Sequence, residues 1–315
     1  MPLISFIYNA IANKGKHPFE VSTFIPLQTS IEVENIQQET IVNAESSMVR
    51  RGRELKSLKR YPVLSVVLPA YNEAKNIREI VFDYFNTIVC KLPSTLVVAE
   101  DGSTDGTKEV LFSLKEEIPM DLFTHPKRKG YAKGVGDALN ASNGDWIFFS
   151  DSDGQYSPTD FWKLWKYREN YDLIIGRKLR RSEGSHRTIL ALGFHLIANF
   201  LFGLNLHDAD CGFRLLRREL ANLVVKEVKF LEYSFWAEFT IRASLKGFRI
   251  LEVPINHADR VHGKTQIYKL SKIPLVVLKQ LKGLANLFRE TRKNSSMSNC
   301  KPAFGWSART FGESS

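Results

Sequence analysis

Short, continuously apolar runs alternate with segments of helical periodicity from residue 61 onward, and this alternation constrains the fold more than any other feature of the chain. A strand that is apolar at every position is buried on both faces, as in parallel sheets covered by helices. The apolar runs lie at 63–68, 96–99, 146–150 and 173–175, with a weaker strand near 121–124, and the helical segments lie at 77–89, 105–117, 131–142 and 161–169. We therefore predict an α/β fold with a mostly parallel sheet.

The composition fits a globular protein with an anionic partner. The chain has 315 residues, of which 43% are hydrophobic, and its formal net charge is +10. Such an excess of positive charge favours nucleic acid, a membrane surface or a phosphorylated substrate as the partner. No recognition helix and no alternation of aromatic and basic residues is recognisable, so we expect no nucleic-acid partner.

Cysteine usage and the absence of long apolar runs indicate the compartment. Cys90, Cys211 and Cys300 are odd in number and far apart, which fits a reducing compartment rather than a disulfide framework or a zinc site. The first residues lack the basic region of a secretory signal, and no run approaches the roughly 18 apolar residues of a spanning helix. We expect a cytoplasmic protein, with peripheral contact to the cytoplasmic face of a membrane left open.

The sequence divides into four predicted regions. Residues 1–60 lack a clean hydrophobic period and read as a partly disordered N-terminal extension. Residues 61–268 form the predicted α/β domain. Residues 269–293 carry seven basic side chains against one acidic one on an apolar helical pattern, and 294–315 read as a flexible tail. A basic amphipathic helix can lie on an anionic membrane surface or pack on its own domain.

Polar clusters follow three of the predicted strands. They are Pro69–Glu73, Glu100–Gly106 and Asp151–Asp153. The carboxyl ends of parallel strands share one sheet edge, where ligands bind in such folds. Each cluster alone can also be explained structurally, as a turn or a helix cap. Two carboxylates two residues apart, however, can hold one Mg²⁺ that shares its shell with substrate phosphates.

Taken in order, these clusters and four later motifs resemble the family-2 glycosyltransferases of GT-A fold, a Rossmann-like sheet covered by helices. The resemblance covers about residues 61–270, and the nearest subgroup is the polyprenyl-phosphate (dolichyl-phosphate) mannosyl- and glucosyltransferases. The later motifs are Lys129–Gly134, Asp208–Arg214, Glu252–Ile255 and Arg260–Thr265. The chain departs from the family pattern at Glu100, which replaces an Asp, and at Gln266, which replaces a Lys for which Lys264 can substitute.

The resemblance implies an inverting transfer from a nucleotide-diphosphate sugar, with Mg²⁺ or Mn²⁺ held by Asp151 and Asp153. A cation there would neutralise charge on the leaving diphosphate. For Lys129 and Lys133, the alternative to a diphosphate contact is a solvated basic turn. The predicted nucleotide-sugar-binding residues are Pro69, Tyr71, Glu73, Asp101, Lys129, Lys133, Asp151 and Gln155.

The acceptor follows from how its nucleophilic oxygen is activated. A sugar hydroxyl needs a general base, whereas a phosphate monoester is already ionised and needs cations. The stretch 177–187 supplies five basic side chains directly after a strand, which favours a polyprenyl phosphate. The predicted acceptor-binding residues are Arg177, Arg187, Arg214 and Lys264.

The candidate catalytic residues depend on that choice. They are Asp153, Asp208, Glu238 and Arg260. Asp208 or Glu238 would be the base for a hydroxyl acceptor in a soluble enzyme, and each also has a structural interpretation, as a loop organiser and as the partner of a nearby arginine. The apolar spacing in 188–206 predicts a second amphipathic helix, which fits a lipid substrate and an anionic membrane surface as partners.

Overall fold

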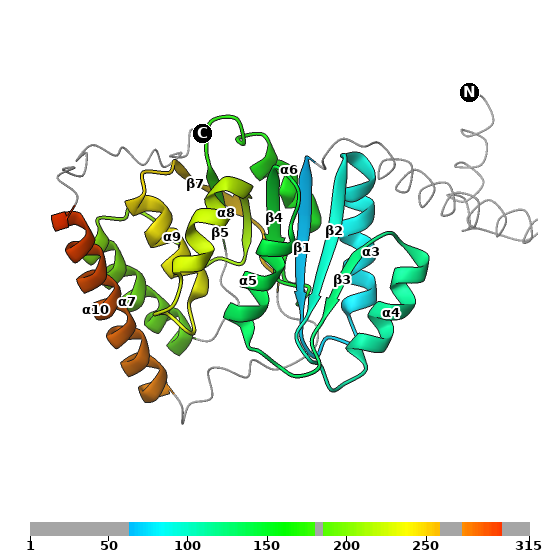
Figure 1. Ribbon diagram of the computed structural model, residues 1–315, viewed down its shortest axis with the longest axis horizontal. Helices are drawn as coiled ribbons and strands as arrows, with labels where there is room; N and C mark the ends of the chain where they lie inside the picture. Colours follow the sequence, from blue (N-terminus) through cyan, green and yellow to red (C-terminus); the bar gives the residue numbers. More distant parts are fainter. Residues whose placement is uncertain (1–62, 180–184, 259–272, 298–315) are drawn as a thin grey trace, which may run out of the picture. The chain divides into compact units, whose positions relative to one another are not determined.

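The computed structural model describes residues 63–179, 185–258 and 273–297 (Figure 1). The predicted extension 1–60, nearly all of the predicted tail 294–315, and the segment with Arg260 and Lys264 lie outside the described residues.

Within the described residues, seven strands form one sheet in the order β3-β2-β1-β4-β6-β5-β7. Strand β6 runs antiparallel to both of its neighbours, and every other neighbouring pair is parallel. The strands are β1 (Leu64–Ala70), β2 (Ser94–Glu100), β3 (Asp121–Thr124), β4 (Trp146–Ser150), β5 (Leu173–Lys178), β6 (Phe213–Arg217) and β7 (Ile250–Ile255). The predicted α/β fold with a mostly parallel sheet is confirmed.

Helices cover this sheet and extend beyond it on one side. In Figure 1, α7 and α10 lie side by side next to α9, away from β1 to β3. The helices are α3 (Ile77–Thr87), α4 (Thr107–Glu117), α5 (Tyr131–Ala141), α6 (Phe161–Trp165), α7 (Ser185–Phe202), α8 (Arg218–Val224), α9 (Phe235–Leu245) and α10 (Ile273–Met297). None of these described helices is both long and apolar enough to cross a bilayer.

The centre of the sheet is fully buried, as its continuous apolar runs predict. Every residue of β4 is buried, and the Phe148 ring packs edge-on against Phe161 and Phe213 at centroid distances of 4.8 and 4.9 Å. Burying a side chain of this size stabilises the fold by about 1.5–3 kcal/mol. The central strands therefore form a rigid base for the loops at their carboxyl ends.

Two helices end at residues other than those expected from the sequence. Helix α7 ends at Phe202 instead of residue 206, because Gly203 adopts a left-handed φ of 66° that terminates it. Helix α10 continues to Met297, past the predicted end at 293, because no proline or glycine interrupts 284–297. The predicted basic loop 177–187 is not one loop either, since Arg177 belongs to β5 and Arg187 to the first turns of α7.

Candidate active site

The three predicted polar clusters meet at one edge of the sheet. Strand β1 pairs in parallel with β2 on one side and β4 on the other, so the loops after these strands leave the same edge. The backbone N–H of Asp101 donates to the carbonyl of Ala70 at 2.9 Å, which extends the β1–β2 pairing into the loops. The prediction that these loops come together is confirmed.

The loops after β1 and β2 are joined by side-chain hydrogen bonds. The N–H of Asn72 donates to Ser103 Oγ at 3.0 Å, and the N–H of Thr104 donates to Asn72 Oδ1 at 2.9 Å. Asn72 has a φ of 56°, a left-handed conformation that asparagine tolerates better than most residues. The N–H of Glu73 donates to Thr107 Oγ1 at 2.9 Å. The loop of Pro69 to Glu73 is thus fixed against the second cluster.

Arg128 and Tyr71 close this end of the site. The guanidinium of Arg128 lies over the Tyr71 ring, 4.1 Å from its centroid, in a cation–π contact. Glu100, which replaces the family Asp, turns its carboxylate back on the N–H of Ser103. The longer side chain is therefore accommodated by the turn itself.

Asp101 is buried and accepts two backbone hydrogen bonds. Its Oδ1 accepts the N–H of Lys129 at 2.7 Å, and its Oδ2 accepts the N–H of Gly130 at 2.9 Å. Asp101 therefore holds the start of α5 in place. Its predicted contact with the nucleotide stays a prediction, and each carboxylate oxygen has a further lone pair for it.

The two predicted lysines lie on or next to α5. Lys129 Nζ lies 2.7 Å from Asp137 Oδ2, and Lys133 is exposed on the same helix. The ion pair of Lys129 favours the solvated-turn alternative, because a contact with diphosphate would have to replace it. Neither predicted diphosphate contact is tested.

Asp151 and Asp153 lie directly past the end of β4. The hydroxyl of Tyr131 donates to Asp151 Oδ1 at 2.8 Å, and the Gln155 N–H donates to Asp153 Oδ1 at 3.2 Å. Withdrawal from water and then the neighbouring Asp153 carboxylate raise the pKa of Asp151 to about 7, although Lys178 partly offsets them. Two like charges thus crowd at this point.

This donor set fits a divalent cation. A cation between the two carboxylates would relieve the repulsion that raises the pKa of Asp151. Carboxylate oxygens suit Mg²⁺ and Mn²⁺, which keep open positions for water and diphosphate oxygens. Among the described residues, no group of three or more His, Cys, Asp and Glu side chains forms a complete metal cage.

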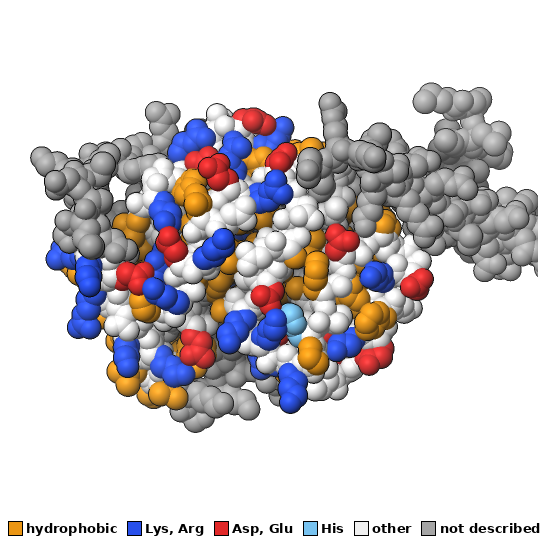
Figure 2. Space-filling view, in the orientation of Figure 1, with side chains coloured by type: hydrophobic (Ala, Val, Ile, Leu, Met, Phe, Trp, Pro, Cys, Tyr) orange, Lys and Arg blue, Asp and Glu red, His pale blue; other side chains and the backbone are white. Residues whose placement is uncertain are grey.

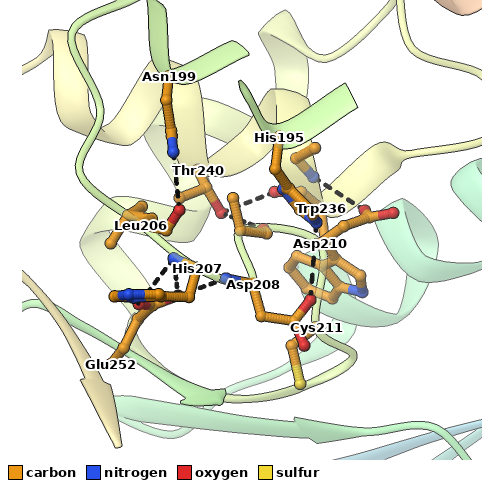
Figure 3. Close-up of polar contacts among 12 residues, drawn as sticks. His195, Asn199, Leu206, His207, Asp208, Asp210, Cys211, Trp236, Thr240 and Glu252 are labelled. Carbon is orange, nitrogen blue, oxygen red and sulfur yellow. Dashed lines mark hydrogen bonds and ion pairs between the residues drawn. The ribbon is translucent and has the colours of Figure 1, made fainter. Parts of the chain in front are cut away.

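The segment after α7 forms a second acidic cluster (Figure 3), close enough to the first for the Asp210 carboxylate to raise the pKa of Asp151. Asp208 is buried, and its Oδ1 lies 3.9 Å from Nε2 of His195 on α7. Glu252 on β7 accepts the backbone N–H groups of His207 and Asp208 at 2.9 and 2.6 Å. Burial raises the pKa of Asp210 to about 6, although Arg214 partly offsets it. Asp208 thus lies in an organised loop, as its structural interpretation expects.

The structure argues against Arg214 as an acceptor-binding residue. Its side chain is 0% exposed and stacks on the Trp236 ring at 4.0 Å. Its N–H groups donate to the carbonyls of Ala209 and Cys211 and to Thr240 Oγ1. All of its donor directions face the protein, so Arg214 organises the loop between α7 and β6.

Glu238 makes its hydrogen bonds and its ion pair with other groups of the protein. It accepts the backbone N–H groups of residues 229, 230 and 231 at 2.7–3.0 Å. It also pairs with Arg242 at 2.8 Å. With 0% exposure, Glu238 has the contacts of a structural partner to an arginine, the alternative to a general base.

The remaining predicted residues lie on the acceptor side. Gln155 donates from Nε2 to the carbonyl of Ala258 at 3.1 Å and accepts the Ala258 N–H at 2.9 Å. It therefore joins the Asp153 loop to the chain just before residue 259. Arg177 is half-buried at the end of β5. The Arg187 side chain, Arg260 and Lys264 lie outside the described residues.

Sequence reasoning missed three residues around Asp151. Tyr131 donates to it, Trp236 Nε1 donates to the Tyr131 oxygen at 3.0 Å, and Lys178 is a nearby cation. Tyr131 lies within the Lys129–Gly134 motif, which is the one signal that could have found it. Trp236 is 105 residues from Tyr131, and nothing local in the sequence links them.

The fold is that of a GT-A glycosyltransferase, and the comparisons agree. The family model for glycosyl transferase family 2 matches residues 65–224, and the chain belongs to that family. Dolichyl-phosphate beta-glucosyltransferases of Mus musculus and Trichomonas vaginalis are 27% and 26% identical to the chain. The matches cover 62% and 66% of this chain and 67% and 68% of those proteins, respectively.

Solved structures share the fold at lower identity. The glucosyl-3-phosphoglycerate synthase of Mycobacterium tuberculosis, in complex with Mn²⁺, UDP-glucose and phosphoglyceric acid, has a TM-score of 0.55 at 21% identity and covers 76% of this chain and 84% of its own. The mannosyl-3-phosphoglycerate synthase of Rubrobacter xylanophilus has a TM-score of 0.51 at 17% identity, with 82% of each chain covered. This likeness shows the GT-A fold.

Proposed function

We propose that this family-2 glycosyltransferase moves a sugar, with inversion, from a nucleoside diphosphate sugar to a polyprenyl phosphate of the dolichyl type. The observation that carries the proposal is the Asp151–Asp153 pair at the sheet edge, with Lys178 of the neighbouring acceptor side close enough to lower the pKa of Asp151. A site with paired carboxylates and adjacent cations suits two phosphorylated substrates. The two dolichyl-phosphate beta-glucosyltransferase relatives support the lipid acceptor and favour glucose as the sugar.

On the donor side, Asp151 and Asp153 would hold Mg²⁺ or Mn²⁺, which when bound supplies positive charge opposite the leaving diphosphate. Asp101 would contact the nucleotide while it holds the start of α5. The wall of Pro69, Tyr71 and Glu73 would exclude water from the same pocket. These roles require a fixed geometry, which the hydrogen bonds between the loops provide.

On the acceptor side, the phosphate oxygen of the lipid would be the nucleophile. It is already anionic, so no side chain has to remove a proton. Arg177 and Lys178 at the end of β5 would hold the phosphate, with Arg187, Arg260 and Lys264 as further candidates. An acceptor of this kind leaves no base role for Glu238, which agrees with its commitment to Arg242.

The outer face of α7 and α10 would meet the membrane that holds such a lipid. Leu196 and Phe200 on α7 are 61% and 88% exposed, and Leu278 on α10 is 65% exposed. Figure 2 shows blue basic and orange apolar side chains interleaved on this side of the molecule. Apolar side chains mixed with Lys and Arg are typical of helices that lie in the interface of an anionic membrane.

The second candidate function is transfer to a soluble acceptor. The solved phosphoglycerate synthases of the same fold act on a small phosphorylated acceptor, and the cations near Asp151 would suit that anion as well. A sugar hydroxyl as acceptor would instead need Asp208 as the base.

One experiment separates these functions. The full-length protein is incubated with Mn²⁺, UDP-glucose or another nucleotide sugar, and either a short polyprenyl phosphate or 3-phosphoglycerate, and the products are identified by mass. A glycosylated polyprenyl phosphate supports the proposal. A product with 3-phosphoglycerate alone replaces the lipid acceptor, and no product with any donor contradicts the transfer itself.

A further inference from the structure

Tyr131 links three elements at the catalytic edge. It is the first residue of α5, its hydroxyl donates to Asp151 Oδ1 at 2.8 Å, and its oxygen accepts the indole N–H of Trp236 on α9 at 3.0 Å. An indole nitrogen only donates, and an ionised carboxylate only accepts. The single hydroxyl proton of Tyr131 is therefore directed at Asp151.

Gly212 lies against the other oxygen of the same carboxylate. A Cβ at Gly212 would overlap Asp151 Oδ2, and the Asp151 N–H donates to the Gly212 carbonyl at 3.1 Å. Oδ1 is thus held by a donor, while Oδ2 lies where only a glycine leaves room. Both oxygens of the Asp151 carboxylate therefore have a close neighbour, the Tyr131 hydroxyl at Oδ1 and the Gly212 backbone at Oδ2.

The support behind Tyr131 is rigid. Trp236 is 1% exposed and packs between the Phe149 ring, with a centroid distance of 4.7 Å, and the Arg214 guanidinium. On the other side, Asp101 holds the N–H groups of the two residues that precede Tyr131. The hydroxyl is therefore anchored through both the side chain of α9 and the backbone of α5.

We propose that Tyr131 is a positioning residue that holds Asp151 in its cation-binding orientation, with Trp236 aiming its hydroxyl and Gly212 forming the opposing wall. The inference rests on the proposed function, in which Asp151 and Asp153 hold the cation. Two adjacent carboxylates repel each other, so without this bond Asp151 would turn away from Asp153 when no cation is bound. Tyr131 counteracts that rotation and prepares the pair for the metal.

The test is Mn²⁺ binding by the full-length protein in the presence of UDP, with free Mn²⁺ measured by electron paramagnetic resonance. Tyr131→Phe removes only the hydroxyl, and we expect it to weaken Mn²⁺ binding by about 10–100-fold, the effect typical of a lost partner of a metal ligand. Gly212→Ala should act in the same direction. Tyr167→Phe, in the turn after α6, is the matched control and should bind Mn²⁺ like the wild type.

A second readout separates positioning from a general loss of structure. Transfer by Tyr131→Phe should be weak at low Mn²⁺ and approach the wild-type kcat when Mn²⁺ is in excess, a rescue that a general loss of structure would not allow. Its melting temperature in EDTA should fall, because the buried indole N–H of Trp236 loses its acceptor. A Tyr131→Phe variant that binds Mn²⁺ within twofold of a binding wild type would overturn the inference and leave the proposed function intact. A wild type that does not bind Mn²⁺ at all would overturn both this inference and the metal-dependent part of the proposed function.

Discussion

The two halves of the sheet end in different ways. Strands β1, β2 and β4 lead into loops whose side chains and backbone hydrogen-bond to one another, as Asn72 does with Ser103. Strands β5 and β7 lead toward α7 and α10, which leave apolar side chains such as Phe200 in solvent. By contrast, α3 buries its apolar residues against β1 and its neighbours. We call β1 to β4 with α3 to α5 the donor half, and β5, β7, α7 and α10 the acceptor half, after the substrates proposed for them. Under that proposal the donor half would need a fixed geometry, and the acceptor half would contact a membrane surface.

The difference has a thermodynamic meaning. An apolar side chain of this size that stays exposed forgoes about 1.5–3 kcal/mol of burial, and several of them together on a monomer mark an interaction site. The loops around Asp101 and Asp151 are instead ordered by hydrogen bonds when the protein folds. A nucleotide that binds between them would therefore cause a smaller loss of conformational entropy. The predictions below test whether the two halves act on different substrates.

The largest expected effect is the loss of the carboxylate pair in the donor half. Asp153→Asn should lower transfer by at least about 10²-fold, because it removes a group that holds charge opposite the leaving diphosphate. Initial rates at saturating donor and varied Mn²⁺ measure it. Asp145→Asn, at the opposite end of β4 and exposed, is the matched control and should keep the wild-type rate. Full wild-type activity in EDTA would contradict the metal assignment.

Glu238 tests whether a hydroxyl acceptor needs a base. Glu238→Gln should lower the free energy of unfolding by roughly 2–3 kcal/mol, because charge-assisted hydrogen bonds to Arg242 and to three backbone N–H groups are weakened, while turnover per folded molecule stays within about twofold. Urea denaturation and active-site-normalised rates measure the two effects. Glu227→Gln, which removes a more exposed partner of Arg242, should cost less than about 1 kcal/mol. A Glu238→Gln variant that is stable but inactive would instead support Glu238 as the general base for a hydroxyl acceptor.

The sequence predicted the donor half far better than the acceptor half. Strands β1, β2, β4 and β5 follow continuous apolar runs and were predicted, as was β3, whose pattern is weaker. Strand β6 was not predicted, because Arg214 and Arg217 interrupt its apolar run. Strand β7 was not predicted, because it contains Glu252 and Pro254. A proline suits β7, which lies at the edge of the sheet. The charge of the buried Arg214 is stabilised by a cation–π contact with Trp236 and by hydrogen bonds to the carbonyls of Ala209 and Cys211. No local sequence pattern reveals these partners.

The same limit applies to the site. The spacing of Asp151 and Asp153 after an apolar strand predicted a carboxylate pair at the sheet edge, and parallel pairing placed Asp101 nearby. The contacts of Tyr131 with Trp236 and of Arg214 with Thr240 join residues far apart in the chain, so they depend on tertiary packing. Motif reasoning therefore located the carboxylates at the sheet edge but not the buried contacts of Arg214, which argue against its predicted acceptor role.

Arg177 tests the acceptor half alone. Arg177→Ala should raise the apparent KM for a short polyprenyl phosphate by about tenfold, the loss of one charge-assisted contact, and leave the KM for the nucleotide sugar unchanged. Steady-state kinetics with each substrate varied in turn measure both. Lys166→Ala, exposed after α6, is the control. An equal rise in both KM values would mean that the donor and acceptor substrates are not bound by separate halves of the molecule.

The raised pKa values give a pH dependence with a definite sign. The pKa of Asp151 is about 7 and that of Asp210 about 6 in the folded protein, against 3.8 as the ordinary value. The folded state therefore binds protons more tightly than the unfolded state, so stability falls as pH rises from about 4 to 7. In EDTA, the melting temperature should therefore be lower at pH 8 than at pH 5. Mn²⁺ should raise it more at pH 8, and Asp210→Asn should reduce the difference.

The smallest expected effect concerns the membrane face. A lysine near an anionic bilayer contributes about 1 kcal/mol, so Lys282→Ala should weaken binding to phosphatidylserine-containing vesicles about fivefold at low salt, and salt should abolish the difference. Lys115→Ala, equally exposed on α4 in the donor half, should change nothing, because that side would face the solvent. Flotation of the full-length protein with vesicles measures both. If the two variants lose binding equally, the attraction is a property of the net charge of +10, and the contrast between the halves does not extend to the membrane. If only Lys282→Ala loses it, α10 is the part of the acceptor half that meets the lipid.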